Sequence, residues 1–215
     1  MTKTIVGLYD DFASAERTVQ DLINSGFARD DISLVASNAT GEYDRYATDI
    51  GTTSTARRTH GNTDDITAGE GAGIGAGIGA AIGGVGGLLM GLGLLAIPGV
   101  GPALAAGPLV SALAGAGIGA AAGGLAGALV NIGVPEEEAG YYAEGVRRGG
   151  TLVTVATNDQ LASRAANTLS RHNPVDIEQR HSYWRERGWT GYDPQSQPYT
   201  AEEIRREREY IHPPL

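Results

Sequence analysis

The sequence contains no cysteine among its 215 residues, which excludes a disulfide framework, a thiolate zinc site and a cysteine nucleophile. Lysine is nearly absent too, because Lys3 is the single lysine beside 15 arginines. The formal net charge is −9, and no run of basic residues is longer than two. Since phosphate binding needs clustered Lys and Arg, we expect no nucleic-acid partner.

Motifs of catalysis and cofactor binding are also missing. The glycine-rich zone has no G-x-x-x-x-G-K-[ST], and no H-x-x-x-H or carboxylate–histidine spacing points to a metal. The acidic pairs Asp10–Asp11 and Asp30–Asp31 sit at strand ends, where we expect them to cap helices or strands. The sequence therefore predicts a protein that is not an enzyme and holds no cofactor or metal. Histidines and serines without a catalytic setting are His60, His172, His181, His212, Ser14, Ser33 and Ser163.

Charge is absent from a long middle segment. Gly71 to Pro135 spans 65 residues without Asp, Glu, Lys, Arg or His, and 21 of the 33 glycines lie between Gly71 and Gly133. "IPGVGP" (Ile97–Pro102) predicts a tight turn that separates one helix over Ile74–Ile97 from a second that starts at Pro108 and ends near Ile132. Each predicted helix is long enough to span a bilayer core of about 30 Å.

Small residues recur at every fourth position in both predicted helices, which is the small-xxx-small mode of close helix packing. We predict a glycine-zipper hairpin, either embedded in a membrane or buried in an oligomer; a disordered low-complexity tract is the third alternative. The acidic flanks argue against a simple spanning hairpin. The predicted helix-packing residues are Gly71, Gly75, Gly79, Gly83, Gly87 and Gly91, then Gly107, Ser111, Gly115, Gly119, Gly123 and Gly127.

The segments on either side of this zone each read as β-α-β. Residues 1–38 predict a strand at Thr4–Tyr9, a helix that starts at Phe12 and stops before Gly26, and a strand at Asp31–Ala36. Residues 135–181 predict a helix after Pro135, a strand over 151–156, a helix over 159–172 and a final strand over 175–180. Two such units should pair into one sheet with helices on one side, a ferredoxin-like arrangement. Alternatively, each half belongs to something else or pairs between chains.

Two further segments complete the predicted organisation. Residues 39–68 are polar and aperiodic, which is typical of a flexible linker. Residues 182–215 form an aromatic tail, where "TAEE" at Thr200–Glu203 is a capping box that predicts a short charged helix over 201–209. Trp184, Trp189 and Tyr192 could make this tail a docking peptide for a protein partner or an interfacial anchor, or the aromatic residues could fold back on the domain.

Three stretches together resemble a known family. "TIVGLYDDFASAERTVQDLINSGFARDDISLVA", "AIPGVGPALAAGP" and "GVPEEEAGYYAEGVRRGGTLVTV" are similar to bacterial general stress proteins of the 17M-like (heat-induced stress protein) family, which includes low-temperature-induced proteins. The resemblance covers roughly residues 3–38 and 70–180. It implies a stress-associated bacterial protein with a split α/β domain and brings no established catalytic residues.

The expected fold class is therefore α+β: a ferredoxin-like domain interrupted by a glycine-zipper hairpin over 69–134 and followed by an irregular tail. The expected function is that of a non-enzymatic general stress protein, associated with membrane lipid on the cytoplasmic side of the bacterial inner membrane. The alternative is a soluble, cytoplasmic scaffold that self-associates through its hairpins. A small-molecule or regulatory site on the open sheet face is a third hypothesis, for which the strands offer few polar or aromatic residues.

Overall fold

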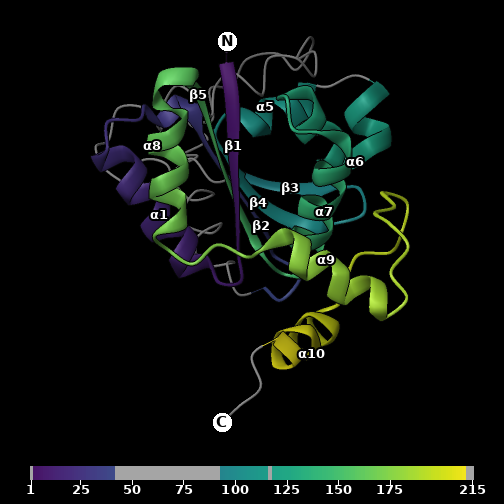
Figure 1. The fold of residues 1–215 in the computed structure, drawn as a ribbon. Helices are drawn as coiled ribbons and strands as arrows, with labels where there is room; N and C mark the ends of the chain where they lie inside the picture. The colour runs from purple at the N-terminus through teal and green to yellow at the C-terminus, as the bar shows by residue number, and fades with distance from the viewer. Residues whose placement is uncertain (1, 42–92, 116–117, 212–215) are drawn as a thin grey trace, which may run out of the picture.

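The protein has a mixed α+β fold built around one five-stranded sheet (Figure 1). The computed structural model describes residues 2–41, 93–115 and 118–211. Nearly all of the predicted linker and all six predicted packing glycines from Gly71 to Gly91 lie outside these residues, so those predictions stay untested.

The sheet runs in the order β1-β5-β2-β4-β3, and every neighbouring pair is antiparallel. β5 lies between β1 and β2, so the two strands of the first predicted β-α-β unit are separated by the strand of the second unit. This arrangement brings the two segments that flank the glycine-rich zone into one sheet, as predicted. The strands are β1 (Thr2–Tyr9), β2 (Ile32–Ser37), β3 (Gly93–Ile97), β4 (Gly101–Ala106) and β5 (Thr151–Asn158).

One face of the sheet is covered by α1 (Phe12–Asn24) and α8 (Asp159–Ser170), both predicted from their helical spacing (Figure 1). Asp11 caps α1 by accepting from the Ser14 backbone N–H at 2.8 Å, as its position at a strand end suggests. A hydrophobic core lies between these helices and the strands, and Phe12, Leu22 and Leu169 are among its buried residues. A 3-10 turn at Arg29–Asp31 then leads into β2.

The other face is not bare, which corrects the prediction of helices on one side only. α5 (Pro108–Gly115), α6 (Ile118–Asn131) and α7 (Glu136–Arg147) cover it. Successive residues of a strand point to opposite faces, so Leu34 packs under α1 and α8 while Val35 packs under the second helical layer. All six residues of β2 are buried for this reason.

The predicted hairpin is found only in part: its second helix begins at Pro108 and ends at Asn131 close to the expected bounds, but the described end of its first helix is wrong. "IPGVGP" does form a tight turn, but the turn joins β3 to β4, so Gly93–Ile97 is strand rather than helix. The second predicted helix is divided into α5 and α6. Within α6, Gly124 has non-helical dihedral angles (φ 55°, ψ −138°), and a Cβ there would lie 2.6 Å from the Pro98 carbonyl oxygen. A glycine is therefore required where α6 passes over the β3–β4 turn.

The predicted final strand at Val175–Arg180 is also wrong. The Val175 backbone N–H donates to the Leu8 carbonyl of β1 at 2.7 Å, as the first residue of an added strand would. The side chain of Asp176 then accepts from the Gln179 N–H and starts α9 (Ile177–Glu186). Because Asp176 occupies a helix-cap position, the chain leaves the sheet edge after a single ladder-like bond.

The predicted capping box is confirmed at the start of α10 (Ala201–Ile211). The Thr200 N–H donates to the Glu203 carboxylate at 2.8 Å, and the Glu203 N–H donates to the Thr200 hydroxyl at 3.3 Å. None of the helices in the described residues combines the length and apolar character that a bilayer crossing requires.

Candidate functional site

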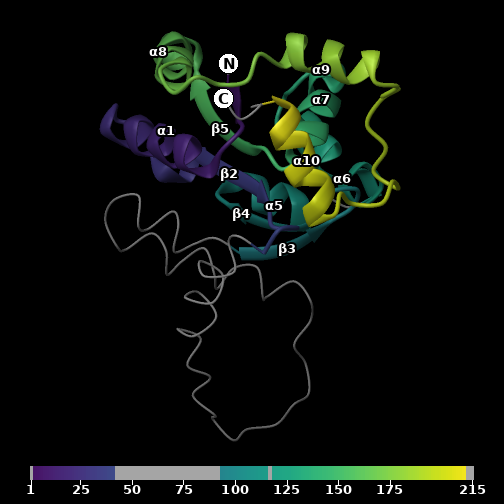
Figure 2. The same ribbon diagram turned by 90° about the horizontal axis from the view of Figure 1, so that it is seen from below.

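The C-terminal tail returns to the domain and packs beside α7. Figure 2 shows α7 between α9 and α6, and α10 lying across the same side of the molecule. Trp184 of α9 is only 1% exposed, and Ile204 of α10 is equally buried. Of the alternatives for the tail aromatics, folding back on the domain is therefore correct for Trp184.

A network of buried charges fixes this tail to α7. Glu144 is fully buried and accepts from Arg147 at 3.1 Å and from Arg148 at 2.6 Å. Arg148 also pairs with Glu207 of α10 at 3.0 Å, and the Trp184 indole N–H donates to the same Glu207 oxygen at 2.9 Å. Burial acts to lower the pKa of Arg148, but Glu144 and other negative groups outweigh that effect and raise it.

Aromatic rings continue from this network toward the surface. Trp184 and Trp189 lie edge to face with ring centroids 5.7 Å apart, and Trp189 lies 5.9 Å from Tyr141 of α7. Tyr141 stacks on His181 at 4.3 Å. The Tyr192 hydroxyl donates to the Pro98 carbonyl at 3.1 Å, which ties the tail to the β3–β4 turn. The tail aromatics thus form one wall beside α7.

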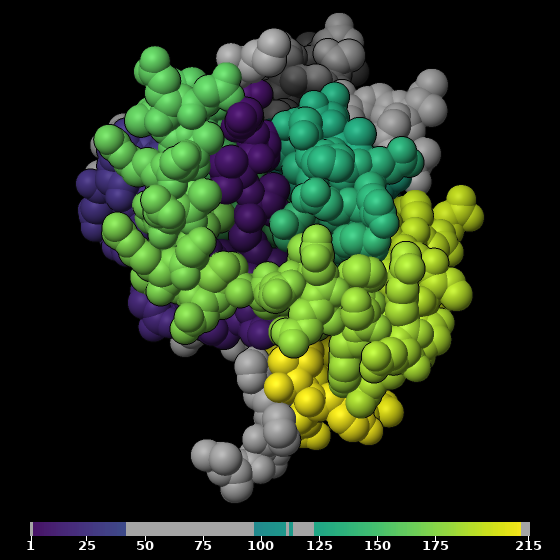
Figure 3. Space-filling model, in the orientation of Figure 1, coloured from purple at the N-terminus to yellow at the C-terminus, as the bar shows by residue number. Residues whose placement is uncertain are grey.

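An open groove of about 720 Å³ is lined by α6, by the first turns of α7 and by these tail residues. In Figure 3 the surface of the tail adjoins that of α6 and α7 along this side of the molecule. Most of the lining is apolar or glycine, and a Cβ added at Gly123 would meet nothing within 4 Å. The lining residues are Gly123, Ala126, Gly127, Val130, Glu136, Glu137, Gly140, Tyr141, Arg185, Trp189, Gly191, Tyr192 and Pro194.

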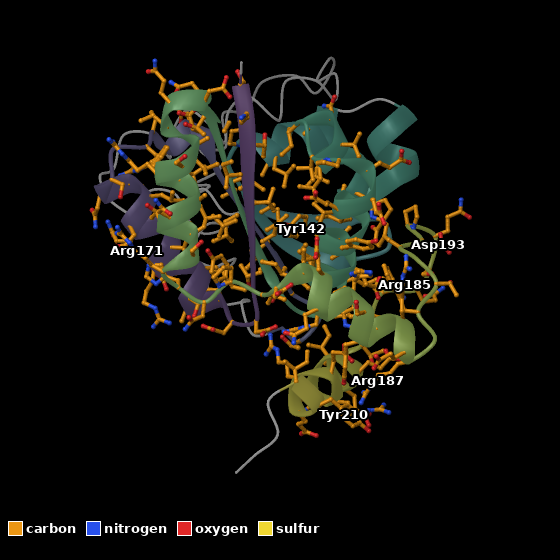
Figure 4. The ribbon with its side chains drawn as sticks, viewed as in Figure 1. Tyr142, Arg171, Arg185, Arg187, Asp193 and Tyr210 are labelled. Atoms are coloured by element: carbon orange, nitrogen blue, oxygen red, sulfur yellow. The ribbon has the colours of Figure 1, made fainter. Side chains whose placement is uncertain are left out.

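Charges of both signs border the groove. Glu136 and Glu137 stand at the start of α7, and Glu137 accepts from the Tyr141 hydroxyl at 2.6 Å. That hydrogen bond is the main reason why the pKa of Tyr141 is raised. Arg185 comes from α9 on the tail side (Figure 4), and no ion pair among the described residues involves it or Glu136.

The structure brings together two sets of residues that the sequence predicts separately. Gly123 and Gly127 of the predicted helix stripe face the same groove as Trp189 and Tyr192 of the predicted tail anchor, with Trp184 behind them. Gly107 is instead the left-handed residue (φ 85°) between β4 and α5, so it is not part of a helix face. Ser111, Gly115 and Gly119 lie within α5 and α6, and nothing more is described of their surroundings.

Sequence reasoning missed the charged and aromatic residues that α7 and α9 add to the groove. The sequence marks Glu136 and Glu137 only as the start of the helix after Pro135, and it predicts a strand where α9, which carries Arg185, begins. The sequence signal for α9 is Asp176 with Gln179 three residues later, because an N-cap aspartate followed at this distance by Glu or Gln is typical of a helix start.

A second hollow, of about 480 Å³, is polar and lies between α1 and α8. Its lining includes Arg164 and Arg171, and Figure 4 places Arg171 on the opposite side of the molecule from Arg185. The described residues contain no group of three or more His, Cys, Asp or Glu that could hold a metal ion.

The groove is thus an apolar, glycine-bearing surface with aromatic and charged borders. No family model, no curated protein and no solved structure matches this chain. The groove itself must therefore supply the argument for function.

Proposed function

We propose that the protein is a non-enzymatic bacterial stress protein that acts by docking, and that the groove between α6, α7 and the tail is its docking site. The observation that carries the proposal is the meeting of Gly123 and Gly127 with Trp189 and Tyr192 around one open, largely apolar groove. Contiguous apolar hollows of this kind mark interaction sites in soluble proteins. The groove suits an apolar surface of small residues, because nothing projects from Gly123 to hold it away.

The stress setting rests on the resemblance to the 17M-like general stress proteins. We propose that the sheet of β1, β5 and β2 with α1 and α8 is the ferredoxin-like part of such a split domain, in which α9 replaces the fourth strand. The β3–β4 hairpin, α5 and α6 are then an insertion that covers the second face. In this proposal the protein works in the bacterial cytoplasm or on the cytoplasmic side of the inner membrane.

Membrane lipid is the second candidate for the docked surface. It is favoured by the uncharged segment from Gly71 to Pro135, whose first part adjoins β3 in sequence. An interfacial role would also use Trp189 and Tyr192, since such rings are enriched at membrane–water boundaries. The two candidates differ in what fills the groove, so one experiment separates them.

The two tryptophans provide the readout. Trp184 and Trp189 are the only two in the sequence, and Trp184 is held inside the charge network while Trp189 lines the groove. In ¹H–¹⁵N spectra of the full chain, the Trp189 indole signal should shift when the groove fills, and the Trp184 signal should not. The titrants are the protein itself and vesicles of phosphatidylglycerol and phosphatidylethanolamine.

The test variant is Gly123→Leu, which places a side chain in the groove. Its matched control is Ala166→Leu, at an exposed position of α8. Gly123→Leu should abolish the Trp189 shift and Ala166→Leu should preserve it. A Trp189 signal that is unchanged by either titrant, or a shift that persists in Gly123→Leu, would rule out docking at the groove.

A further inference from the structure

We infer that the occupant of the groove is the same groove region of a second copy of this chain, related by a twofold axis, so that α6 of each copy enters the groove of the other. The inference rests on the proposed docking function and goes beyond it by naming the partner. It is carried by three properties of the described residues: the exposed apolar face of α6, the position of α6 at one side of the groove, and the charges on the two borders.

The first property is exposure of α6. Val130 is 42% exposed, and only Tyr210 is a more exposed large hydrophobic residue among those described. Val130 shares its helix face with Ala126 and Gly127, since residues three and four apart are neighbours on a helix, and Gly123, on the other side of the break at Gly124, lines the same groove. Small residues such as Ala126 and Gly127 on a helix face allow another helix backbone to approach closely. This face therefore fits another helix of its own kind.

The second property is the place of α6 at one side of the groove. α7 packs against both α6 and α9, whereas α6 lines the groove opposite the tail residues. A helix at the side of a groove can enter a facing groove, whereas α7 is packed between two neighbouring helices and cannot. In two copies that face each other, α6 of each copy can thus enter the groove of the other, and the two α6 helices then lie against each other.

The third property is charge. In an interface with twofold symmetry, any residue i that contacts residue j of the partner is matched by j contacting i. A border of one sign would repel itself, but this groove carries Glu136 on α7 and Arg185 on α9. Neither has an ion-pair partner among the described residues. A second copy supplies the missing partner to both residues in two equivalent pairs.

Charge reversal tests this arrangement. Arg185→Glu leaves only acidic residues on both borders, and Glu136→Arg places a second basic side chain opposite Arg185 of the other copy. Each variant alone should dimerise about tenfold more weakly than the wild type, because like charges then face each other. An equimolar mixture of the two variants should restore dimers, since each contact is again between opposite charges. Arg164→Glu on α8 changes the net charge as Arg185→Glu does, but it lies away from the groove and should leave dimerisation unchanged.

Sedimentation velocity over a concentration series measures these species, with circular dichroism to confirm that each variant is folded. Glu136→Gln and Arg185→Gln serve as milder variants. Each alone loses both ion pairs, and their mixture regains one of the two, so the mixture should dimerise more tightly than either variant alone and more weakly than the wild type. A wild type that stays monomeric, single variants that dimerise normally, or a mixture that does not recover would each overturn the inference. If the wild type is monomeric but vesicles still shift the Trp189 signal, docking at the groove survives and the second copy is wrong. If Gly123→Leu changes nothing in either assay, both proposals fail.

Discussion

Glu144 shows how a single side chain can decide whether the tail stays in place. Its carboxylate is fully buried, and its two oxygens face the guanidinium groups of Arg147 and Arg148. Arg148 in turn links α7 to α10 through Glu207. A buried charge network contributes little net stability compared with an apolar core, but removing one member leaves the others without compensation. The network is therefore sensitive to loss of any one charge.

Glu144→Gln should accordingly lower the free energy of unfolding by about 3–5 kcal/mol. The matched control is Glu202→Gln, because Glu202 pairs with Arg206 at 3.5 Å while its side chain is 73% exposed. Exposed pairs of this kind contribute about 0–1 kcal/mol. Urea denaturation followed by circular dichroism compares the two variants. Equal, small losses for both would show that the buried network does not hold the tail.

At the scale of elements, local signals in the sequence predicted most of the sheet and its first helical layer. The strand before Asp10 and the helix from Phe12 formed as expected, because the strand is a β-branched run bounded by Asp10 and Asp11, and the helix has apolar residues at helical spacing after the Asp11 cap. The β3–β4 hairpin was missed because Gly, Ala and Leu follow one another there in no regular order and without polar residues. An apolar run without polar residues shows no period that separates strand from helix.

The groove could be predicted only in pieces. Gly123 and Gly127 stand out by their spacing, and Trp189 and Tyr192 by their concentration in the tail. Nothing local places these two pairs together, because their meeting depends on the return of the chain past the edge of β1. That return follows from one competition, in which Asp176 starts a helix where the alternation of "VDIEQR" favours a strand.

Tail and domain should unfold as one unit, because they share a buried core. Ile204 is 1% exposed and lies against Gly149, so Ile204→Ala should cost about 2–5 kcal/mol, whereas the exposed Arg205→Ala should cost little. Both tryptophans lie in the tail, so their fluorescence reports the tail while far-ultraviolet dichroism reports the whole chain. The two urea transitions should coincide in the wild type and shift together in Ile204→Ala. A fluorescence transition that precedes the dichroism transition would identify a detachable arm instead.

At the scale of the whole molecule, helices on both faces turn an antiparallel sheet into the middle of three layers. The strands must then be apolar on both sides, which the buried β2 illustrates. The second layer is formed by the glycine-rich α5 and α6 together with α7, and the tail packs on that layer in turn. Two tyrosines, Tyr142 and Tyr192, are partly buried within these outer contacts. Their ionisation couples the stability of the whole assembly to alkaline pH.

Burial raises the pKa of Tyr142 to about 12, with Glu138 adding to the effect, and burial likewise raises the pKa of Tyr192 to about 12. A tyrosine in the unfolded chain has a pKa of about 10. Because the folded state keeps these protons longer, their contribution to stability is complete below about pH 10 and is lost as pH rises toward about 12. The free energy of unfolding should therefore fall between these pH values, and it should fall less in Tyr142→Phe/Tyr192→Phe. Urea titrations at stepped pH, with tyrosinate absorbance recorded alongside, measure this change, and Tyr210→Phe at an exposed position is the control. An equal alkaline loss in the double variant and in Tyr210→Phe would show that the two buried hydroxyls do not set the alkaline limit of the fold.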